Sequence, residues 1–459
     1  KKEDIIMYWD EPTITMDYET HECHDIIKNI WCENKIPNVV LSSATLPQKE
    51  EIMNTIMDFK TRFDGDDYSI VSYDCKKSIS LINKEGFVEM PHYMFDEHEK
   101  VCRVVNHCNK QKTLLRYLDL EEVVKCIKVC NNHLRHSVFK VENYFKDIKG
   151  INMLSIKLYY LQMLKNVKQG QWSSIHATLT NDRTKKMDSN VYVSGKDANT
   201  LTDGPTIFLA DDVTKISRFC LQDANIPKQM LSTMMTKIGN NTKLIDKIAV
   251  LEKEYEDGTK KDNDKEKKMG DGRVSDVMKT VLKKIEDLKQ QIDTISLNPY
   301  YVPNKKEHLE RFVDDGADKN CFTSDISDDI VEKIMMIDDV EDIWKVLLLM
   351  GIGVFTNHKN IKYMEIMKLL AQQQKLYLIV ASSDFIYGTN YQFCHGYVGK
   401  DLESMSQEKC IQAMGRVGRN KLQQEYTVRF RDNGLIYRLF QEQENKPEVL
   451  NMTRLFTTK

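Results

Sequence analysis

Short apolar runs alternate with helix-like stretches near both ends of this 459-residue chain. Early in the chain, residues 5–9 and 38–41 flank a helix-like stretch around residues 20–34. Later, the apolar runs 206–210, 376–381 and 426–430 stand beside helical patterns in the same way. Strands that alternate with helices favour parallel βαβ units, because a parallel strand pair needs a crossover connection. The sequence therefore predicts an α/β fold with parallel sheets.

Two segments of another character interrupt this pattern. Residues 76–195 are rich in helical patterns, so we interpret them as a helix-rich linker or insertion. Residues 230–296 carry apolar side chains at alternating steps of four and three, which is typical of a heptad seam. These positions are Leu244, Ile248, Leu251 and Tyr255, then Val274, Met278, Val281, Ile285, Leu288, Ile292 and Ile295.

The stretch 256–272 joins the two halves of this heptad pattern and is charged and glycine-containing, so we interpret it as a solvated turn. The whole segment then predicts an antiparallel coiled-coil hairpin. The hairpin is either a projecting arm for a protein partner or a nucleic-acid strand, or an inert insertion in a surface loop. Both interpretations stay open at this point.

Composition narrows the classes of protein without choosing one. The 66 Lys and Arg against 69 Asp and Glu give a net charge of −3, so the chain as a whole has no excess of positive charge. Eleven scattered cysteines with no secretory segment are typical of reduced thiols, and predict an intracellular protein of the cytoplasm or nucleus. No apolar run approaches the roughly 18 residues that span a bilayer, so we expect no membrane partner. Neither His21, Cys23, His24 and Cys32 nor Cys126, Cys130 and His133 shows the paired spacing of a zinc site.

Two carboxylates follow the first apolar run, in Trp9-Asp10-Glu11-Pro12-Thr13. Adjacent carboxylates at the end of a strand can take different roles in phosphoryl transfer. Asp10 would hold Mg²⁺ on a nucleotide, and Glu11 would orient and polarise the attacking water. By itself an acidic pair after a strand is more often an ordinary loop.

Two further motifs favour the catalytic interpretation of this acidic pair over an ordinary loop. Val39-Val40-Leu41-Ser42-Ser43-Ala44-Thr45-Leu46-Pro47 is an apolar run that ends in hydroxyl residues, and Ser43 and Thr45 could hydrogen-bond to the acidic pair. The stretch Gln412-Ala413-Met414-Gly415-Arg416-Val417-Gly418-Arg419 places two arginines three residues apart, each directly after a glycine. Guanidinium groups can neutralise charge on a transferring γ-phosphate, and glycine lets the backbone approach a ligand closely.

These motifs, in this order, resemble motifs II, III and VI of superfamily 2 helicases. Gly351-Ile352-Gly353-Val354-Phe355, followed by a motif V that ends in Gly388-Thr389-Asn390, is similar to the Ski2-like group. Pro205 to Ala210 looks like motif IV. The resemblance implies two RecA-like parallel-sheet domains, with ATP and Mg²⁺ between them and a single strand of RNA or DNA in the inter-domain groove.

The resemblance also implies residue roles and domain boundaries. Asp10, Glu11, Gln412, Arg416 and Arg419 would be catalytic; Gly388, Asn390 and Gly415 would face the nucleotide; Ser43 and Thr45 would couple the domains, and Ser382 would touch the strand backbone. Residues 1–75 would be the C-terminal part of the first RecA-like domain and 76–195 an insertion. Residues 196–435 would be the second domain, with the hairpin 230–296 inserted, and 436–459 a tail. The many Lys, Asn and Ile codons suggest an A+T-rich genome, such as that of a giant virus or a protist; a viral protein would act in the viral factory or virion.

Some features depart from the Ski2-like pattern. Thr13 stands where histidine is usual in motif II, and the sequence contains no Gly-x-x-x-x-Gly-Lys-[Ser/Thr] phosphate-binding loop. We expect that loop upstream of Lys1, in which case this stretch alone would hydrolyse no ATP. Two alternatives stay open: a catalytically inactive helicase-like binding or scaffold protein, and a superfamily 2 translocase that moves on duplex without separating its strands.

Overall fold

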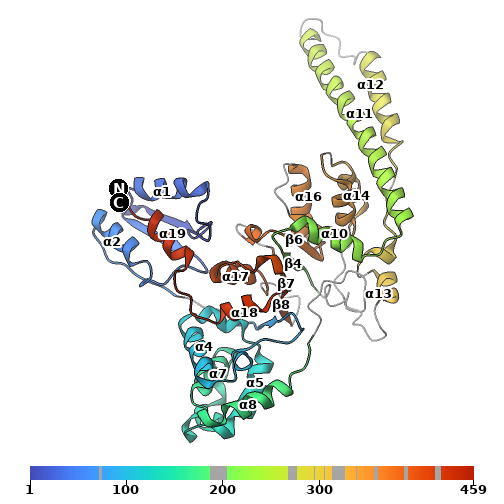
Figure 1. Ribbon diagram of the computed structural model, residues 1–459. Coiled ribbons are helices and arrows are strands. Elements are labelled where there is room, and N and C mark those ends of the chain that lie inside the picture. Colours follow the sequence, from blue (N-terminus) through green and yellow to red (C-terminus); the bar gives the residue numbers. More distant parts are fainter. Residues whose placement is uncertain are drawn as a thin grey trace. The chain divides into compact units, whose positions relative to one another are not determined.

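Figure 1 shows a computed structural model of the chain. It describes residues 1–71, 75–186, 204–266, 276–293, 295–303, 305–312, 326–337, 339–355, 360–386, 391–418 and 425–458. The chain forms two compact units. Unit 1 contains Lys1–Asn190, Phe208–Asp211 and Ser383–Lys459, and unit 2 contains Val191–Ile207 and Asp212–Ser382.

The strands form two sheets, and the α/β prediction with parallel sheets is confirmed. In the small sheet, β1 (Ile6–Asp10) pairs in parallel with β2 (Asn38–Ser42), with Asp10 opposite Ser42. The larger sheet has the strand order β3-β8-β7-β4-β6-β5. Its strands are β3 (Ile79–Ile82), β4 (Thr206–Leu209), β5 (Ile352–Phe355), β6 (Leu378–Ala381), β7 (His395–Val398) and β8 (Tyr426–Phe430). The pairs β3–β8, β7–β8 and β5–β6 are parallel.

One face of the β1–β2 sheet packs against helices from both ends of the chain. Trp9, Val39 and Leu41 contact a buried cluster supplied by α1 (Cys23–Glu33), the segment before α2 (Met53–Arg62), and α19 (Pro447–Leu455). The cluster is Met16, Ile27, Trp31, Ile52, Met452, Leu455 and Phe456. Residues 436–459, predicted as a tail, therefore include a helix that packs in this core, because α19 turns its apolar side chains onto the sheet.

Of residues 76–195 the structure describes 76–186, and the helices α3 to α8 in this range all lie in unit 1. They are α3 (Pro91–Met94), α4 (His98–Lys110), α5 (Leu120–Cys130), α6 (Val141–Tyr144), α7 (Met153–Lys165) and α8 (Trp172–Asn181). The segment begins with β3, however, which pairs with β8. Short 3-10 helices occur throughout the chain: η1 (Lys2–Asp4), η2 (Lys112–Tyr117), η3 (Asn131–His133), η4 (Ser137–Phe139), η5 (Ile148–Gly150), η6 (Gln169–Gln171), η7 (Pro299–Tyr301), η8 (Ser383–Ile386) and η9 (Lys400–Leu402).

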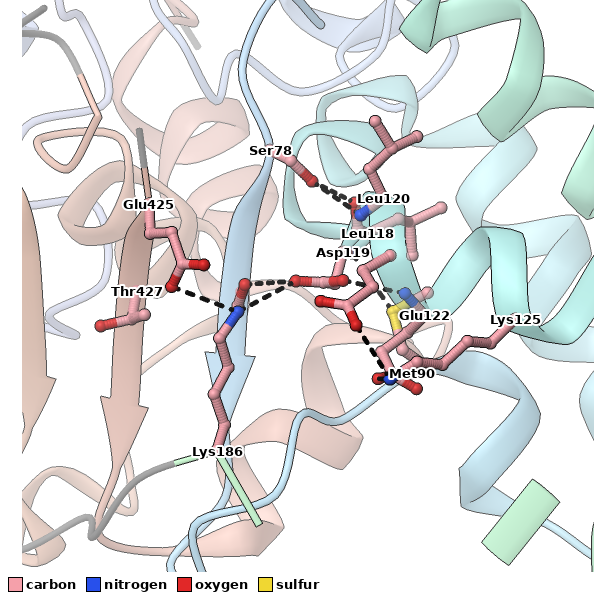
Figure 2. Close-up of polar contacts among 12 residues, drawn as sticks. Ser78, Met90, Leu118, Asp119, Leu120, Glu122, Lys125, Lys186, Glu425 and Thr427 are labelled. Carbon is pink, nitrogen blue, oxygen red and sulfur yellow. Dashed lines mark hydrogen bonds and ion pairs between the residues drawn. The ribbon is translucent and has the colours of Figure 1, made fainter. Parts of the chain in front are cut away.

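Asp119 joins the helical segment to the edge of the larger sheet (Figure 2). Its carboxylate accepts a hydrogen bond from Ser80 of β3, and it also caps α5 by accepting from the Glu122 amide at 2.9 Å. Lys186 Nζ lies between this carboxylate and that of Glu425, at 3.7 and 3.6 Å. All these contacts fasten one element to another, so we interpret buried Asp119 as structural.

Unit 2 contains the helices α10 (Val213–Asp223), α11 (Lys228–Glu266), α12 (Asp276–Lys289), α13 (Lys306–Phe312), α14 (Asp328–Met335), α15 (Asp342–Leu349) and α16 (Ile361–Gln372). Helices α11 and α12 contact each other, and Lys289 Nζ lies 2.9 Å from Glu252 Oε1. Helix α11 continues through Glu266, so the predicted turn from residue 256 begins too early. Lys and Glu favour helix, and Gly258 costs only about 1 kcal/mol in a helix interior. Within the described residues, no helix combines the length and apolar character that a membrane span requires.

Candidate functional site

Asp10 and Glu11 lie where β1 ends, beside the end of β2. The Asp10 side chain is exposed. Glu11 has a φ of 50°, in the left-handed region that non-glycine residues seldom adopt, and its amide donates to the Ser42 carbonyl at 2.7 Å. This backbone turn ends the strand and brings the Glu11 carboxylate beside Ser43.

The Glu11 carboxylate joins the three predicted motifs. Its Oε2 accepts hydrogen bonds from Ser43 Oγ at 2.7 Å and from Gln412 Nε2 at 3.0 Å. Ser43 Oγ in turn accepts from the amide of buried Thr45 at 3.2 Å and lies 3.2 Å from Thr13 Oγ1. Thr13 thus bonds to the Ser-Ala-Thr motif. Among the described residues, Glu11 Oε1 makes no hydrogen bond, so one carboxylate oxygen is anchored while the other is open.

Helix α17 (Gln407–Met414) supplies Gln412, and every residue of this helix is buried. Ser406 caps its start by accepting from the Lys409 amide, and Gly415 follows its end. A Cβ atom on Gly415 would lie 3.2 Å from the Gln412 carbonyl oxygen, which is tighter than ordinary packing, so glycine suits this position. Arg416 comes directly after this glycine and is half-buried.

Lys409 forms a second polar cluster one helical turn before Gln412. Its Nζ donates to Asp17 Oδ2 at 2.7 Å, Asp384 Oδ1 at 2.9 Å and Tyr18 OH at 3.0 Å, and its side chain is 4% exposed. Burial alone would lower the pKa of Lys409, but these hydrogen bonds outweigh it and raise the pKa. We call Lys409, Asp17, Tyr18 and Asp384 the Lys409 cluster. Sequence reasoning missed it; the one available signal was a lysine three residues before Gln412 on the same predicted helix.

Glu448 of α19 reaches the start of the same helix. Its side chain is buried, and Ser406 donates a hydrogen bond to it. Burial, together with the charges of Glu408 and Asp17, outweighs this hydrogen bond and raises the pKa of Glu448 from 4.5 to about 7.

We therefore expect Glu448→Gln to stabilise the protein above pH 7. Between pH 4.5 and about 7 the folded state keeps a proton on Glu448 that the unfolded state loses, so stability falls as pH rises through this window. Glutamine removes that penalty and keeps an acceptor for Ser406. Thermal unfolding at pH 8 should show a gain of as much as about 3 kcal/mol, which disappears near pH 4.5. Exposed Glu444→Gln is the matched control, and an equal gain in both variants would contradict the assignment of a raised pKa to Glu448.

The remaining predicted residues are placed only in part. Ser382 is half-buried and follows β6 in unit 2. Arg419, Gly388 and Asn390 lie outside the described residues. The structure thus brings Glu11, Ser43, Thr45 and Gln412 together, with Asp10 next to them in the chain.

Asp10 is the residue through which Mg²⁺ was predicted to bind. Within the described ranges no three His, Cys, Asp or Glu side chains gather into a metal site. Mg²⁺ on a nucleotide usually needs only one or two protein carboxylates, because phosphate oxygens and waters fill its other positions. The exposed Asp10 carboxylate at a strand end fits that requirement.

The sequence was also compared with known proteins. Neither protein-family models nor curated proteins match the chain. The functional interpretation therefore depends on the residues and their geometry.

Proposed function

We propose that this chain is part of an ATP-driven motor that unwinds or moves along RNA or DNA, similar to the Ski2-like helicases of superfamily 2. The observation that carries the proposal is the hydrogen bonding at Glu11. Gln412 is 401 residues away in sequence and Ser43 is 32 residues away, yet both donate to the same carboxylate oxygen. Three motifs that separately have ordinary explanations therefore converge on one of the groups that the helicase interpretation makes catalytic.

In this proposal the chain holds ATP between two RecA-like domains. Asp10 would hold the Mg²⁺ of a nucleotide, which would supply positive charge beside the phosphates. Glu11 orients the attacking water through its open oxygen, while Ser43 and Gln412 fix the other oxygen. Arg416 and Arg419 would neutralise the γ-phosphate, and Gly388, Asn390 and Gly415 would face the nucleotide.

The same hydrogen bonds suggest how hydrolysis is linked to movement. A motor must change shape when its nucleotide changes, and the groups that touch the γ-phosphate must sense that change. Ser43 donates to the Glu11 carboxylate and accepts from the Thr45 amide, so a shift of the Glu11 carboxylate reaches the residue that directly follows β2. Ser382 would contact the nucleic-acid strand. We place the motor inside the cell, in the cytoplasm, nucleus or viral factory.

We also propose that helices α11 and α12 form the arm predicted from the heptads. Asn241 of α11 bonds to Asp293, which follows α12, and Glu252, further along α11, pairs with Lys289 at the end of α12. The contacts thus advance along α11 while they move back toward α12, which supports an antiparallel coiled-coil hairpin. We propose that it is an arm for a protein partner, with the inert insertion as the alternative.

Nucleic-acid-stimulated ATP hydrolysis tests the motor directly. In the intact protein, phosphate release should rise severalfold or more when single-stranded RNA or DNA is added, and should cease when Mg²⁺ is chelated. Tight nucleic-acid binding with no hydrolysis would instead favour the inactive binding or scaffold alternative. Stimulation by duplex alone would favour the duplex translocase.

A further inference from the structure

The connection between α5 and α7 is long and solvent-facing. Residues 131–152 contain only the one-turn helices η3, η4, α6 and η5. Two of its aliphatic side chains stand in solvent, Val138 at 68% exposure and Ile148 at 86%. Connections of this length are uncommon in compact domains, and binding loops are among the kinds that occur.

This part of the chain is strongly basic. Residues 128–168 contain eight Lys and Arg but only two acidic residues, whereas the whole chain has 66 Lys and Arg against 69 Asp and Glu. The two carboxylates are engaged locally: Glu142 accepts from Asn131 Nδ2 at 3.1 Å, and Asp147 accepts from the Lys149 amide at 3.0 Å. Lys157 is buried and donates to the Leu115 carbonyl oxygen.

The other seven cations are exposed or half-exposed, and no ion pair is seen for them in the described part of the chain. They are Lys128, Arg135, Lys140, Lys146, Lys149, Lys165 and Lys168. Uncompensated cations at this density attract a polyanion, because each one gains a counter-charge that the protein itself does not supply.

A short backbone pairing gathers three of these cations. Leu134 and Val167 form an antiparallel bridge, flanked by hydrogen bonds from the Arg135 amide to Asn166 and from the Lys168 amide to His133. Arg135 also donates its Nε to the Val167 carbonyl oxygen at 3.1 Å, which holds the base of the guanidinium. Lys165 lies in the last turn of α7, just before this bridge. We call Arg135, Lys165 and Lys168 the α7 basic surface.

We propose that the α7 basic surface binds the phosphate backbone of RNA or DNA, separately from the site at Glu11. Lys and Arg bind phosphate oxygens in any sequence context, so this contact would add affinity without base specificity. The choice of nucleic acid over other polyanions rests on the proposed function. The binding itself needs neither ATP nor Glu11.

Equilibrium binding without nucleotide tests the proposal. The probe is a fluorescein-labelled single strand of mixed sequence, followed by anisotropy across a series of salt concentrations. We expect Arg135→Gln/Lys165→Gln/Lys168→Gln to reduce the slope of log K against log salt by about 2, since each lost phosphate contact removes about 0.7 on a single strand. Affinity at low salt should fall about tenfold or more.

The matched control is Lys253→Gln/Lys283→Gln/Lys284→Gln, which removes three exposed lysines from α11 and α12. The control should bind like the wild type, and thermal unfolding should be unchanged in both variants. An unchanged slope in the first variant, or an equal fall in both, would overturn the proposal. If the first variant instead bound the strand normally but lost binding to phosphatidylserine vesicles, the surface would be a lipid contact. A reduced slope in a protein without ATPase activity would uphold the surface and refute the motor.

Discussion

Glu11→Gln should lower the kcat of nucleic-acid-stimulated ATP hydrolysis by about 10³-fold in the intact protein, within the range typical of lost general-base catalysis. The amide keeps the size of the side chain but carries no negative charge to polarise water. It can still accept one hydrogen bond from Ser43 or Gln412, so the site should keep its shape. Nucleotide affinity should change little, because the lost interaction matters mainly in the transition state.

Steady-state phosphate release at saturating ATP measures this effect, and exposed Glu33→Gln on α1 is the matched control. Ser43→Ala should have a smaller effect, about tenfold, because Gln412 still anchors Oε2 at 3.0 Å. Near-wild-type turnover in Glu11→Gln would show that this carboxylate only fastens β1 to α17. The motor proposal would then lose the observation on which it stands.

Lys409→Met should destabilise the protein by about 3 kcal/mol, because removing one partner of a buried ion pair leaves the other charge uncompensated. Asp17 bears most of this cost, since its side chain is 11% exposed, whereas that of Asp384 is 58% exposed and can be solvated. For a unit of this size the loss corresponds to a fall in Tm of roughly 6–12 °C.

The pH dependence distinguishes a lost charge from lost packing. In the wild type the raised pKa of Lys409 keeps its contribution complete below pH 10.5, and the contribution is lost only as pH rises further. The variant has no such group, so its deficit relative to the wild type should shrink as pH rises above 10.5, whereas a deficit from lost packing would persist. Glu448, whose pKa is about 7, also acts on this region, so Glu448→Gln should be included as a background.

Asp17→Asn/Lys409→Met should recover part of the stability that Lys409→Met loses, because the uncompensated carboxylate is gone. Lys110→Met is a matched control: Lys110 pairs with Glu442 at 2.6 Å, but both side chains are more than half exposed, so the cost should stay below about 1 kcal/mol. A pH-independent loss with no recovery in the double variant would mean that Lys409 contributes through packing alone.

The strands that could be predicted from the sequence are those whose own residues already show a strand pattern. β1, β2, β4, β6 and β8 are apolar runs bounded by polar residues, so their burial could be predicted from the run itself. Residues 351–355, which include β5, were singled out only through the family resemblance. β3 and β7 were missed: β3 lies at the start of a segment dominated by helical patterns, and β7 begins with His395 and Gly396. The His395 ring bonds to Thr427 on the next strand, a partner that no local pattern reveals.

The residues of the candidate site likewise include some that could be predicted from the sequence and some that could not. Asp10, Glu11, Ser43 and Gln412 were recognised because their residue types and order resemble a family. Lys409, Asp17 and Tyr18 have no such pattern, and a lysine on a helix is ordinarily exposed. Its burial follows from α17, which is enclosed along its whole length. Whether a helix is enclosed depends on the tertiary structure, and a short stretch of sequence does not reveal it.

The packing of α19 on the β1–β2 sheet has a consequence for synthesis on the ribosome. The Phe456 ring packs at a tilt against both Trp9 and Trp31, and its centroid lies 5.1 Å from that of Trp9 and 4.9 Å from that of Trp31. A nascent chain grows from its N-terminal end, so β1 and β2 emerge hundreds of residues before the aromatic ring that completes their core. Until then their apolar face has no native cover, and such a surface is prone to aggregate or to engage chaperones. The residues translated first in this chain are therefore among the last to reach their native environment.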